Sequence, residues 1–376
     1  MSEGTTGYET ARIQVLEGLE AVRKRPGMYV GSTGEHGLHN LLFSVTHRAV
    51  NEVLAGRTRR VDVTLMSDGW ARVADDGPGD PVEAPLTRMQ AGKPPLERHD
   101  VSAGYIGLEL FVANALSSRL TAEVRRAGVR WVQEYARGVA LTPPTEAGPA
   151  SRSGTSIAFR PDDEIFQVRE FSFDALADHF RELAFLNQAL EISLSDRRHP
   201  AEPREERYRF PGGARDFVAF LDGGDGPDDD IFGFEHEAPR MAGTLEVALR
   251  WRAVAVADGG ERIRTFANSR PTNGGGTHDR GFRTGVAAAL TAHARRHHLL
   301  PAAAPDLDAD RVGAGLTAVV SVKLDDVEFE GATKDVLGNT AVRGCVEEAV
   351  RDHLGQWLVH HPEGAAAVIG RLLGRE

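Results

Sequence analysis

Residues 37–79 carry the pattern that decides the fold, GLHNLLFSVTHRAVNEVLAGRTRRVDVTLMSDGWARVADDGPG. Apolar side chains recur at helical spacing through residues 37–55, which predicts a long helix with one buried face. Two segments of alternating polarity follow at 61–66 and 70–74, and these predict antiparallel strands joined by a turn at 67–69. The quoted stretch therefore predicts a helix, then a hairpin, then a glycine-rich loop.

The sequence on either side of this stretch continues the mixture of helices and hairpins. Before and after it we predict helices at 11–24, from near 107 to 116 and at 172–187, and strands near 120–126, 130–136 and 155–159. Gly212-Gly213 is interpreted as a domain junction. Beyond it we predict helices at 214–221, 279–295 and 336–359, with strands near 244–251, 261–267 and 316–323. This mixture favours an α+β fold over a doubly wound parallel sheet.

Composition limits the class of protein. The chain has 376 residues, which is enough for two domains, and 41% hydrophobic with 26% charged residues is typical of a soluble globular protein. Its single cysteine, Cys345, excludes a disulfide framework or a multi-cysteine zinc site. The formal charge of -11 means that any contact with DNA needs a local basic patch. We see neither a signal peptide nor a membrane span, so we expect a cytoplasmic protein with no membrane partner.

Several segments together resemble the B subunit of bacterial DNA gyrase and topoisomerase IV. They follow the family's order over nearly the whole chain: Tyr8 to Gly31, Glu52 to Gly56, Asp75 to Pro81, Val112 to Ser117, Ser153 to Thr155, Arg181 to Asn187, Gly274 to Arg283 and Val319 to Asn339. The resemblance implies a Bergerat-type (GHKL) ATPase domain, a two-layer α/β sandwich, at 1–211. It implies a transducer domain with a βαβ core at 212–376. We expect no cleavage domain in this chain, and therefore no DNA cutting by it alone.

The family's two catalytic positions on the long helix are altered. The resemblance implies a glutamate that acts as general base and an asparagine that holds Mg²⁺, and these positions are Ser44 and Arg48. Serine is not basic near neutral pH, and arginine stays protonated and cannot bind a cation. The alternative interpretation of both positions is a solvated helix face, which is compatible with the loss of activity. His47 points about 100° away from Arg48 around the helix, so we predict a surface or partner-facing residue rather than a substitute base.

The adenine end of the site resembles the family more closely. Asp75 matches the aspartate that accepts the adenine amino group, Gly79 the glycine that lets the chain approach the ring, and Thr155 the threonine that supports the aspartate. Two family arginines are replaced, by Pro78 and Val132.

The phosphate end keeps some residues of the family and loses others. Gly104 and Gly107 remain of the glycines that bring backbone N–H groups to the phosphates. Glu109 replaces a further glycine and would repel a triphosphate. In the second domain, Lys334 matches the lysine that reaches the terminal phosphate, whereas Ala332 replaces the glutamine of the same loop.

Two functions stay open at this point. The chain is either a pseudo-ATPase, a binding or regulatory module of the topoisomerase system, or an ATP-dependent type II topoisomerase subunit with a rearranged site. In a third, narrower hypothesis Arg48 replaces Mg²⁺ and pairs with phosphate directly, so that ATP binds and Mg²⁺ is dispensable. The resemblance also implies a homodimer formed through the N-terminal arm around Tyr8 and Ile13, a gyrase or topoisomerase subunit as partner, and contact with DNA.

Overall fold

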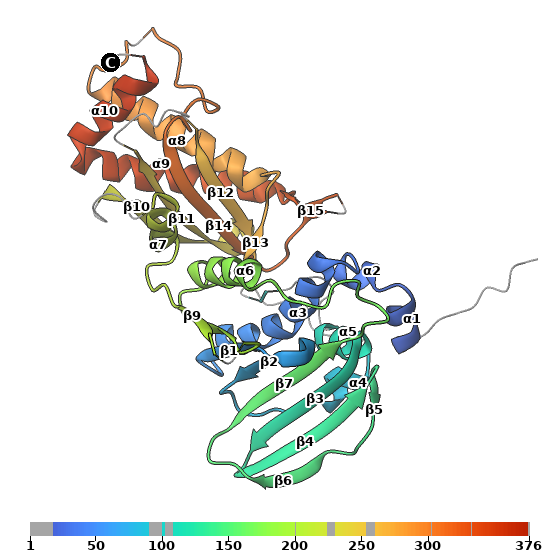
Figure 1. Cartoon of the computed structure of the whole chain (residues 1–376). Helices are drawn as coiled ribbons and strands as arrows, with labels where there is room; N and C mark the ends of the chain where they lie inside the picture. The colour runs from blue at the N-terminus through green and yellow to red at the C-terminus, as the bar shows by residue number, and fades with distance from the viewer. Residues whose placement is uncertain are drawn as a thin grey trace, which may run out of the picture.

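The described residues form two large sheets, each covered by helices, which lie one above the other in Figure 1, and a third sheet of two short strands. This computed structural model describes residues 18–89, 100–101, 108–199, 201–223, 230–252, 260–301, 303–331 and 333–374. Within them, no helix is long and apolar enough to cross a membrane.

The first sheet is mostly antiparallel. Its strands lie in the order β5-β4-β3-β7-β2-β1-β8-β9, with β6 beside β4, and only the pairing of β1 with β8 is parallel among the pairs described. The strands are β1 (Arg60–Leu65), β2 (Ala71–Asp75), β3 (Ser117–Arg126), β4 (Val129–Ala136), β5 (Val139–Ala140), β6 (Thr145–Pro149), β7 (Gly154–Pro161), β8 (Glu191–Asp196) and β9 (Arg204–Tyr208). The mostly antiparallel sheet, with helices between its strands in the chain, confirms the predicted α+β fold class.

Helices of the first unit pack on this sheet, and α3 is the longest of those described. They are α1 (Gly18–Lys24), α2 (Gly27–Val30), α3 (Glu35–Leu54), α4 (Glu83–Thr87), α5 (Glu109–Ala115) and α6 (Phe173–Phe185). The predicted apolar stripe of α3 is buried throughout, at Leu38, Leu41, Leu42, Val45, Ala49 and Val53. Burial of this stripe against the strands fixes which side of the helix faces the loop after β2.

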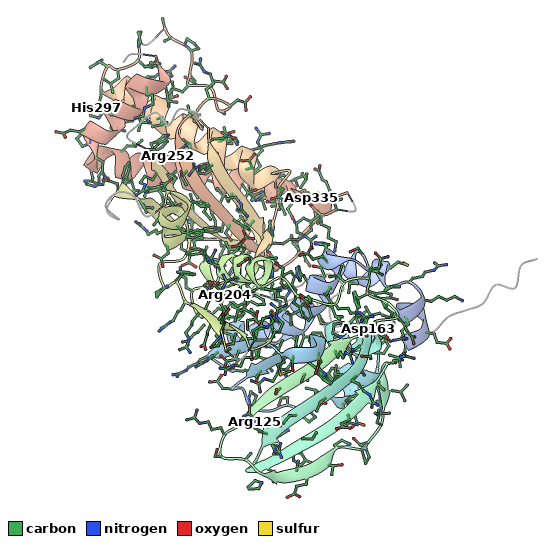
Figure 2. The ribbon with its side chains drawn as sticks, viewed as in Figure 1. Arg125, Asp163, Arg204, Arg252, His297 and Asp335 are labelled. Carbon is green, nitrogen blue, oxygen red and sulfur yellow. The ribbon has the colours of Figure 1, made fainter. Side chains whose placement is uncertain are left out.

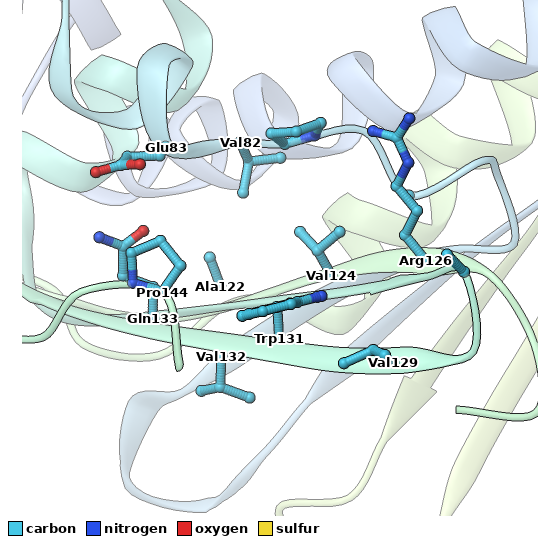
Figure 3. Close-up of a pocket in the computed structure, with 13 residues that line it drawn as sticks. Val82, Glu83, Ala122, Val124, Arg126, Val129, Trp131, Val132, Gln133 and Pro144 are labelled. Carbon is cyan, nitrogen blue, oxygen red and sulfur yellow. The ribbon is translucent and has the colours of Figure 1, made fainter. Parts of the chain in front are cut away.

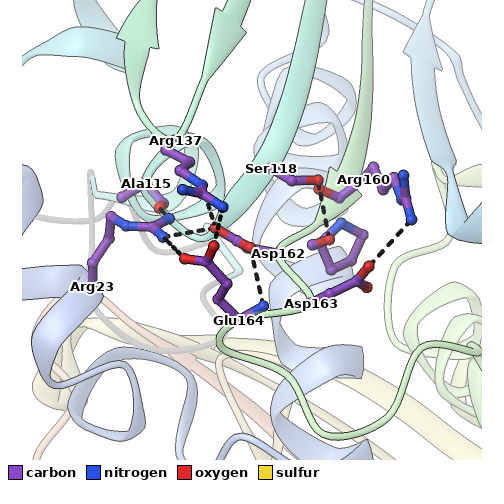
Figure 4. Close-up of polar contacts among 9 residues, drawn as sticks. Arg23, Ala115, Ser118, Arg137, Arg160, Asp162, Asp163 and Glu164 are labelled. Carbon is purple, nitrogen blue, oxygen red and sulfur yellow. Dashed lines mark hydrogen bonds and ion pairs between the residues drawn. The ribbon is translucent and has the colours of Figure 1, made fainter.

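A cluster of charged side chains ties α1 to the end of the sheet (Figure 4). Asp162 follows β7, and its Oδ2 accepts from Arg23 at 2.6 Å and lies 3.0 Å from Nε of Arg137. Arg23 also donates to the carbonyl oxygen of Ala115 at 2.8 Å, and Arg137 donates to Glu164. The carboxylate of Asp162 therefore joins α1 to the turn after β4, and Arg23 joins α1 to α5.

The second unit has a five-stranded sheet, counted over the described residues, in the order β10-β11-β14-β12-β13. Its elements are α7 (Ala214–Leu221), β10 (Phe232–Ala238), β11 (Gly243–Trp251), β12 (Arg262–Ala267), β13 (Arg270–Pro271), α8 (Thr277–Arg296), β14 (Leu316–Leu324), β15 (Phe329–Glu330), β16 (Val336–Leu337), α9 (Thr340–His360) and α10 (Pro362–Leu372). β12 and β14 are parallel and α8 lies between them in the chain, which makes the expected βαβ unit.

The two units share a small core at their junction, where many side chains meet around α6 and α7 (Figure 2). Phe185 at the end of α6 is buried and stacks on Phe210 and Phe217, with ring centroids 3.8 Å and 4.6 Å away. These aromatic contacts join the last helix of the first unit to the first helix of the second.

Polar contacts also cross the junction. Asn187 donates to the hydroxyl of Ser269 at 3.1 Å, and it accepts from the ammonium of Lys323 on β14 at 2.9 Å. Glu246 on β11 accepts from the backbone N–H of Ala214 at 2.8 Å, at the start of α7. Burial lowers the pKa of Lys323 from its ordinary value, and the carboxylates of Glu246 and Glu235 oppose this shift.

Candidate nucleotide site

Ser44 and Arg48 lie one turn apart on α3, on the side that faces β2. The hydroxyl of Ser44 donates to the carbonyl oxygen of Asn40 in its own helix at 2.9 Å. Arg48 reaches away from α3, and its Nη1 donates to Oδ2 of Asp75 at 2.7 Å. Both residues are turned into the protein, so the interpretation of these positions as a solvated helix face is wrong.

Asp75 is the centre of this group of residues. It is the last residue of β2 and is 6% exposed. Its Oδ1 accepts from the backbone N–H of Gly77 at 3.0 Å and of Thr155 at 3.2 Å, while Oδ2 takes the guanidinium of Arg48. The carboxylate thus accepts hydrogen bonds from two backbone N–H groups and one guanidinium.

Thr155 lies on β7 directly opposite Asp75 in the antiparallel register. Directly paired residues share one face of a sheet, so its side chain lies on the same side as the carboxylate. The Thr155 hydroxyl is buried and has no hydrogen-bond partner among the described residues. A buried hydroxyl without a partner is uncommon, and a bound water or ligand atom would supply the missing hydrogen bond.

The backbone conformation alone explains why position 79 is a glycine. Its φ is +76°, and a Cβ there would lie 2.2 Å from the carbonyl oxygen of Arg125 on β3. The close approach of the loop to this strand therefore requires glycine whether or not a ligand is bound. The prediction that Gly79 contacts an adenine ring stays a prediction.

A cavity of about 340 Å³ begins at Gly79 and lies between the loop after β2 and strands β3 and β4 (Figure 3). Val82 forms part of one wall and Trp131 part of the opposite wall. Val132, at the position of a family arginine, is among the lining residues, and Arg126 is the arginine among them. The lining is mainly apolar, so this cavity favours an uncharged, flat group over an anion.

His47 is buried at 3% exposure, so the prediction of a surface or partner-facing residue is wrong. The 100° offset from Arg48 turns it against α6, where its Nε2 lies 3.2 Å from Nε2 of His179. Phe43 covers the pair, with its ring centroid 3.8 Å from that of His179. The two imidazoles share one hydrogen bond, so at least one of them is neutral in the folded chain.

This pair predicts a pH dependence of stability. Burial lowers the pKa of His47, with a further contribution from His179, and burial lowers the pKa of His179 from 6.5 to about 4. The unfolded chain then binds more protons below pH 6.5, so stability falls as pH drops from about 6.5 towards 4. For His179 this amounts to on the order of 3 kcal/mol at most. We expect urea unfolding at pH 7 and pH 4.5 to show the loss, and His179→Gln to reduce it. Equal losses in both proteins would contradict this origin.

Other predicted site residues fall elsewhere. Gly104 and Gly107, with Tyr8 and Ile13 of the N-terminal arm, lie outside the described residues. Lys334 is exposed in the turn between β15 and β16, with a φ of +58°. Its proposed contact with a terminal phosphate therefore stays a prediction.

The residue types at this site suit adenine better than they suit Mg²⁺. The carboxylate of Asp75 and the free hydroxyl of Thr155 suit the polar edge of a purine. At the helix, Arg48 is itself a cation and cannot take the place of a Mg²⁺ ligand, and Ser44 supplies only a neutral hydroxyl, which donates to its own helix. The adenine end is chemically suited to its ligand and the metal end is not.

Comparison with known proteins gives the same family throughout. The family model described as DNA gyrase B matches residues 213–376. The B subunit of Streptomyces coelicolor DNA gyrase is 39% identical over 98% of this chain and 57% of its own length. The 43K ATPase domain of Thermus thermophilus gyrase B, solved with an aminocoumarin, has a TM-score of 0.78 at 33% identity over 96% of this chain and 95% of that one. The topoisomerase IV ATP binding domain of Francisella tularensis has a TM-score of 0.74 at 27% identity, covering 95% and 96%.

The chain has the class of fold found in GHKL-type ATPases. In this sandwich the long helix α3 faces Asp75 and the glycine-containing loop after β2. Within that class, the chain belongs to the family of DNA gyrase and topoisomerase IV B subunits. The chain spans about three fifths of the length of the curated relatives it matches.

Proposed function

We propose that this chain is a gyrase B-like pseudo-ATPase, a binding or regulatory module of the DNA topoisomerase system. The observation that carries the proposal is the pair of contacts at the catalytic positions. Ser44 is not basic and donates to its own helix, and Arg48 is a cation held by Asp75, so Ser44 cannot act as the general base and Arg48 cannot bind Mg²⁺. The family's fold remains around a site that lacks its catalytic chemistry.

The same proposal includes the organisation and the partners. Residues 1–211 form the ATPase-like domain and residues 212–376 the transducer-like domain. The partners are a second copy of the chain, bound through the N-terminal arm, a gyrase or topoisomerase subunit, and DNA, all in the cytoplasm. ATP is the candidate ligand, and Mg²⁺ is not required for its binding.

The proposal is tested by ATP turnover. A positioned general base contributes roughly 10²–10⁴-fold to a rate, so we expect this chain to turn over ATP at least about 100-fold more slowly than the Thermus thermophilus domain at a matched temperature. A coupled phosphate-release assay measures both proteins. Comparable turnover by the two proteins would refute the pseudo-ATPase.

A second candidate is an ATP-dependent topoisomerase subunit with weak activity. It is favoured by the intact pairing of Asp75 with Thr155 across β2 and β7. In this case turnover is measurable and falls in Asp75→Asn, whereas turnover that survives this substitution comes from a contaminant.

A further inference from the structure

Arg48 occupies the carboxylate that a nucleotide base would use. Its Nη1 lies 2.7 Å from Oδ2 of Asp75, and the other carboxylate oxygen is already taken by two backbone N–H groups. The Asp75 side chain is 3% exposed and that of Arg48 19%. The ion pair is therefore largely shielded from water, and a ligand reaches Oδ2 only in competition with the guanidinium.

A second carboxylate lies within reach of the same guanidinium. Glu52 is one turn further along α3, and its Oε1 is 4.0 Å from Nη2 of Arg48. Glu52 is also paired with Arg57 at 2.8 Å, so it keeps a cation when Arg48 turns towards Asp75. Arg48 can therefore leave Asp75 without losing every anionic neighbour.

We propose that Arg48 is an internal ligand of the nucleotide site, which a purine nucleotide displaces by exchange. The phosphates attract the guanidinium, the amino group of the base takes its place on Asp75, and the unpartnered hydroxyl of Thr155 gains a partner. Arg48 thereby sets the ligand class: a purine carrying both an amino group and phosphates binds, and a nucleoside without phosphates does not. The inference rests on the proposed function, since it takes Arg48 to be unable to bind Mg²⁺.

The test compares adenosine with ATP by calorimetry, in the presence of EDTA, on the full chain. The native protein binds ATP and shows no adenosine binding. In Arg48→Asn, Asp75 is free, so adenosine binding appears, at least about tenfold tighter than the weakest affinity that the calorimetry detects. Asp75→Asn added to Arg48→Asn removes this gain, because the acceptor for the base is lost. Arg48→Gln is the second variant if Arg48→Asn does not fold, because its neutral amide is a weaker partner for Asp75 than the guanidinium, so adenosine displaces it more easily.

Equal adenosine binding by the native chain and by a folded Arg48 variant would overturn the exchange, and so would the absence of adenosine binding in every variant. ATP binding to the native chain that requires Mg²⁺ would overturn it as well. These outcomes are distinct from failure of the proposed function, which turns on hydrolysis. Hydrolysis of ATP by the chain would refute the pseudo-ATPase. If the chain does not hydrolyse ATP and Arg48→Asn leaves adenosine binding unchanged, only the exchange is refuted.

Discussion

Asn187→Ala will lower the free energy of unfolding by about 3 kcal/mol, because a buried amide with three hydrogen bonds is removed and its partners are left unpaired. The native amide accepts from the Lys323 ammonium at 2.9 Å and donates to Ser269 at 3.1 Å and to the carbonyl oxygen of Leu183 at 2.8 Å. Alanine cannot replace any of these bonds. We expect urea denaturation followed by circular dichroism to show the loss, together with unfolding in two steps as the units separate.

The neighbouring residue provides the control for this result. Gln188 is exposed, and it donates to Glu246 across the same junction at 3.3 Å. Gln188→Ala should cost less than about 0.5 kcal/mol, as exposed substitutions usually do. If the two alanine variants unfold at the same urea concentration, the buried amide does not hold the units together.

Asp162→Ala will cost a similar amount, about 3 kcal/mol, because one carboxylate at 1% exposure neutralises two guanidinium groups. The matched control is Asp163→Ala. Asp163 is 39% exposed and pairs with Arg160 at 3.2 Å on the surface, where ion pairs contribute little (Figure 4). Thermal unfolding of the three proteins at pH 7 measures the difference.

Acid provides an independent check on Asp162. Burial alone would raise its pKa, but the hydrogen bond from Arg23, with the backbone N–H of Glu164 and the charge of Arg137, holds that pKa below 3.8. A carboxyl with a lowered pKa in the folded state stabilises the fold above its unfolded pKa and loses this contribution as the pH falls further. The deficit of Asp162→Ala should therefore shrink below pH 3.8. A deficit that does not depend on pH would point to lost packing.

Long periodic segments were the most predictable part of the fold. The helix predicted at 37–55 is α3, Glu35–Leu54, and the strands predicted at 61–66 and 70–74 are β1 and β2 within one residue. The predicted α7 agrees with the structure in both bounds. The short strand β5 and the separate helix α10 were not predicted. A strand of two residues is too short to show a hydrophobic period, and Pro362 indicates only where a helix can start.

The site was predictable in its residue types but not in its contacts. Asp75 and Thr155 face each other as the family resemblance implies. The bond from Arg48 to Asp75 spans 27 positions and depends on where a long side chain comes to rest, which the spacing along a helix does not give. His47 was misassigned for a related reason. Helical geometry indicated the direction of its side chain, but not that α6 covers that direction.

The stack of Phe185 on Phe210 and Phe217 has a practical consequence for shortening the chain. A fragment that ends at residue 211 keeps Phe185 and Phe210 but loses Phe217 and the rest of α7, which bury them. The two rings would then face solvent at the end of α6 and form an exposed hydrophobic patch. Such a fragment would self-associate on expression. A fragment that ends after α7, at residue 223, would keep the rings covered and would not self-associate.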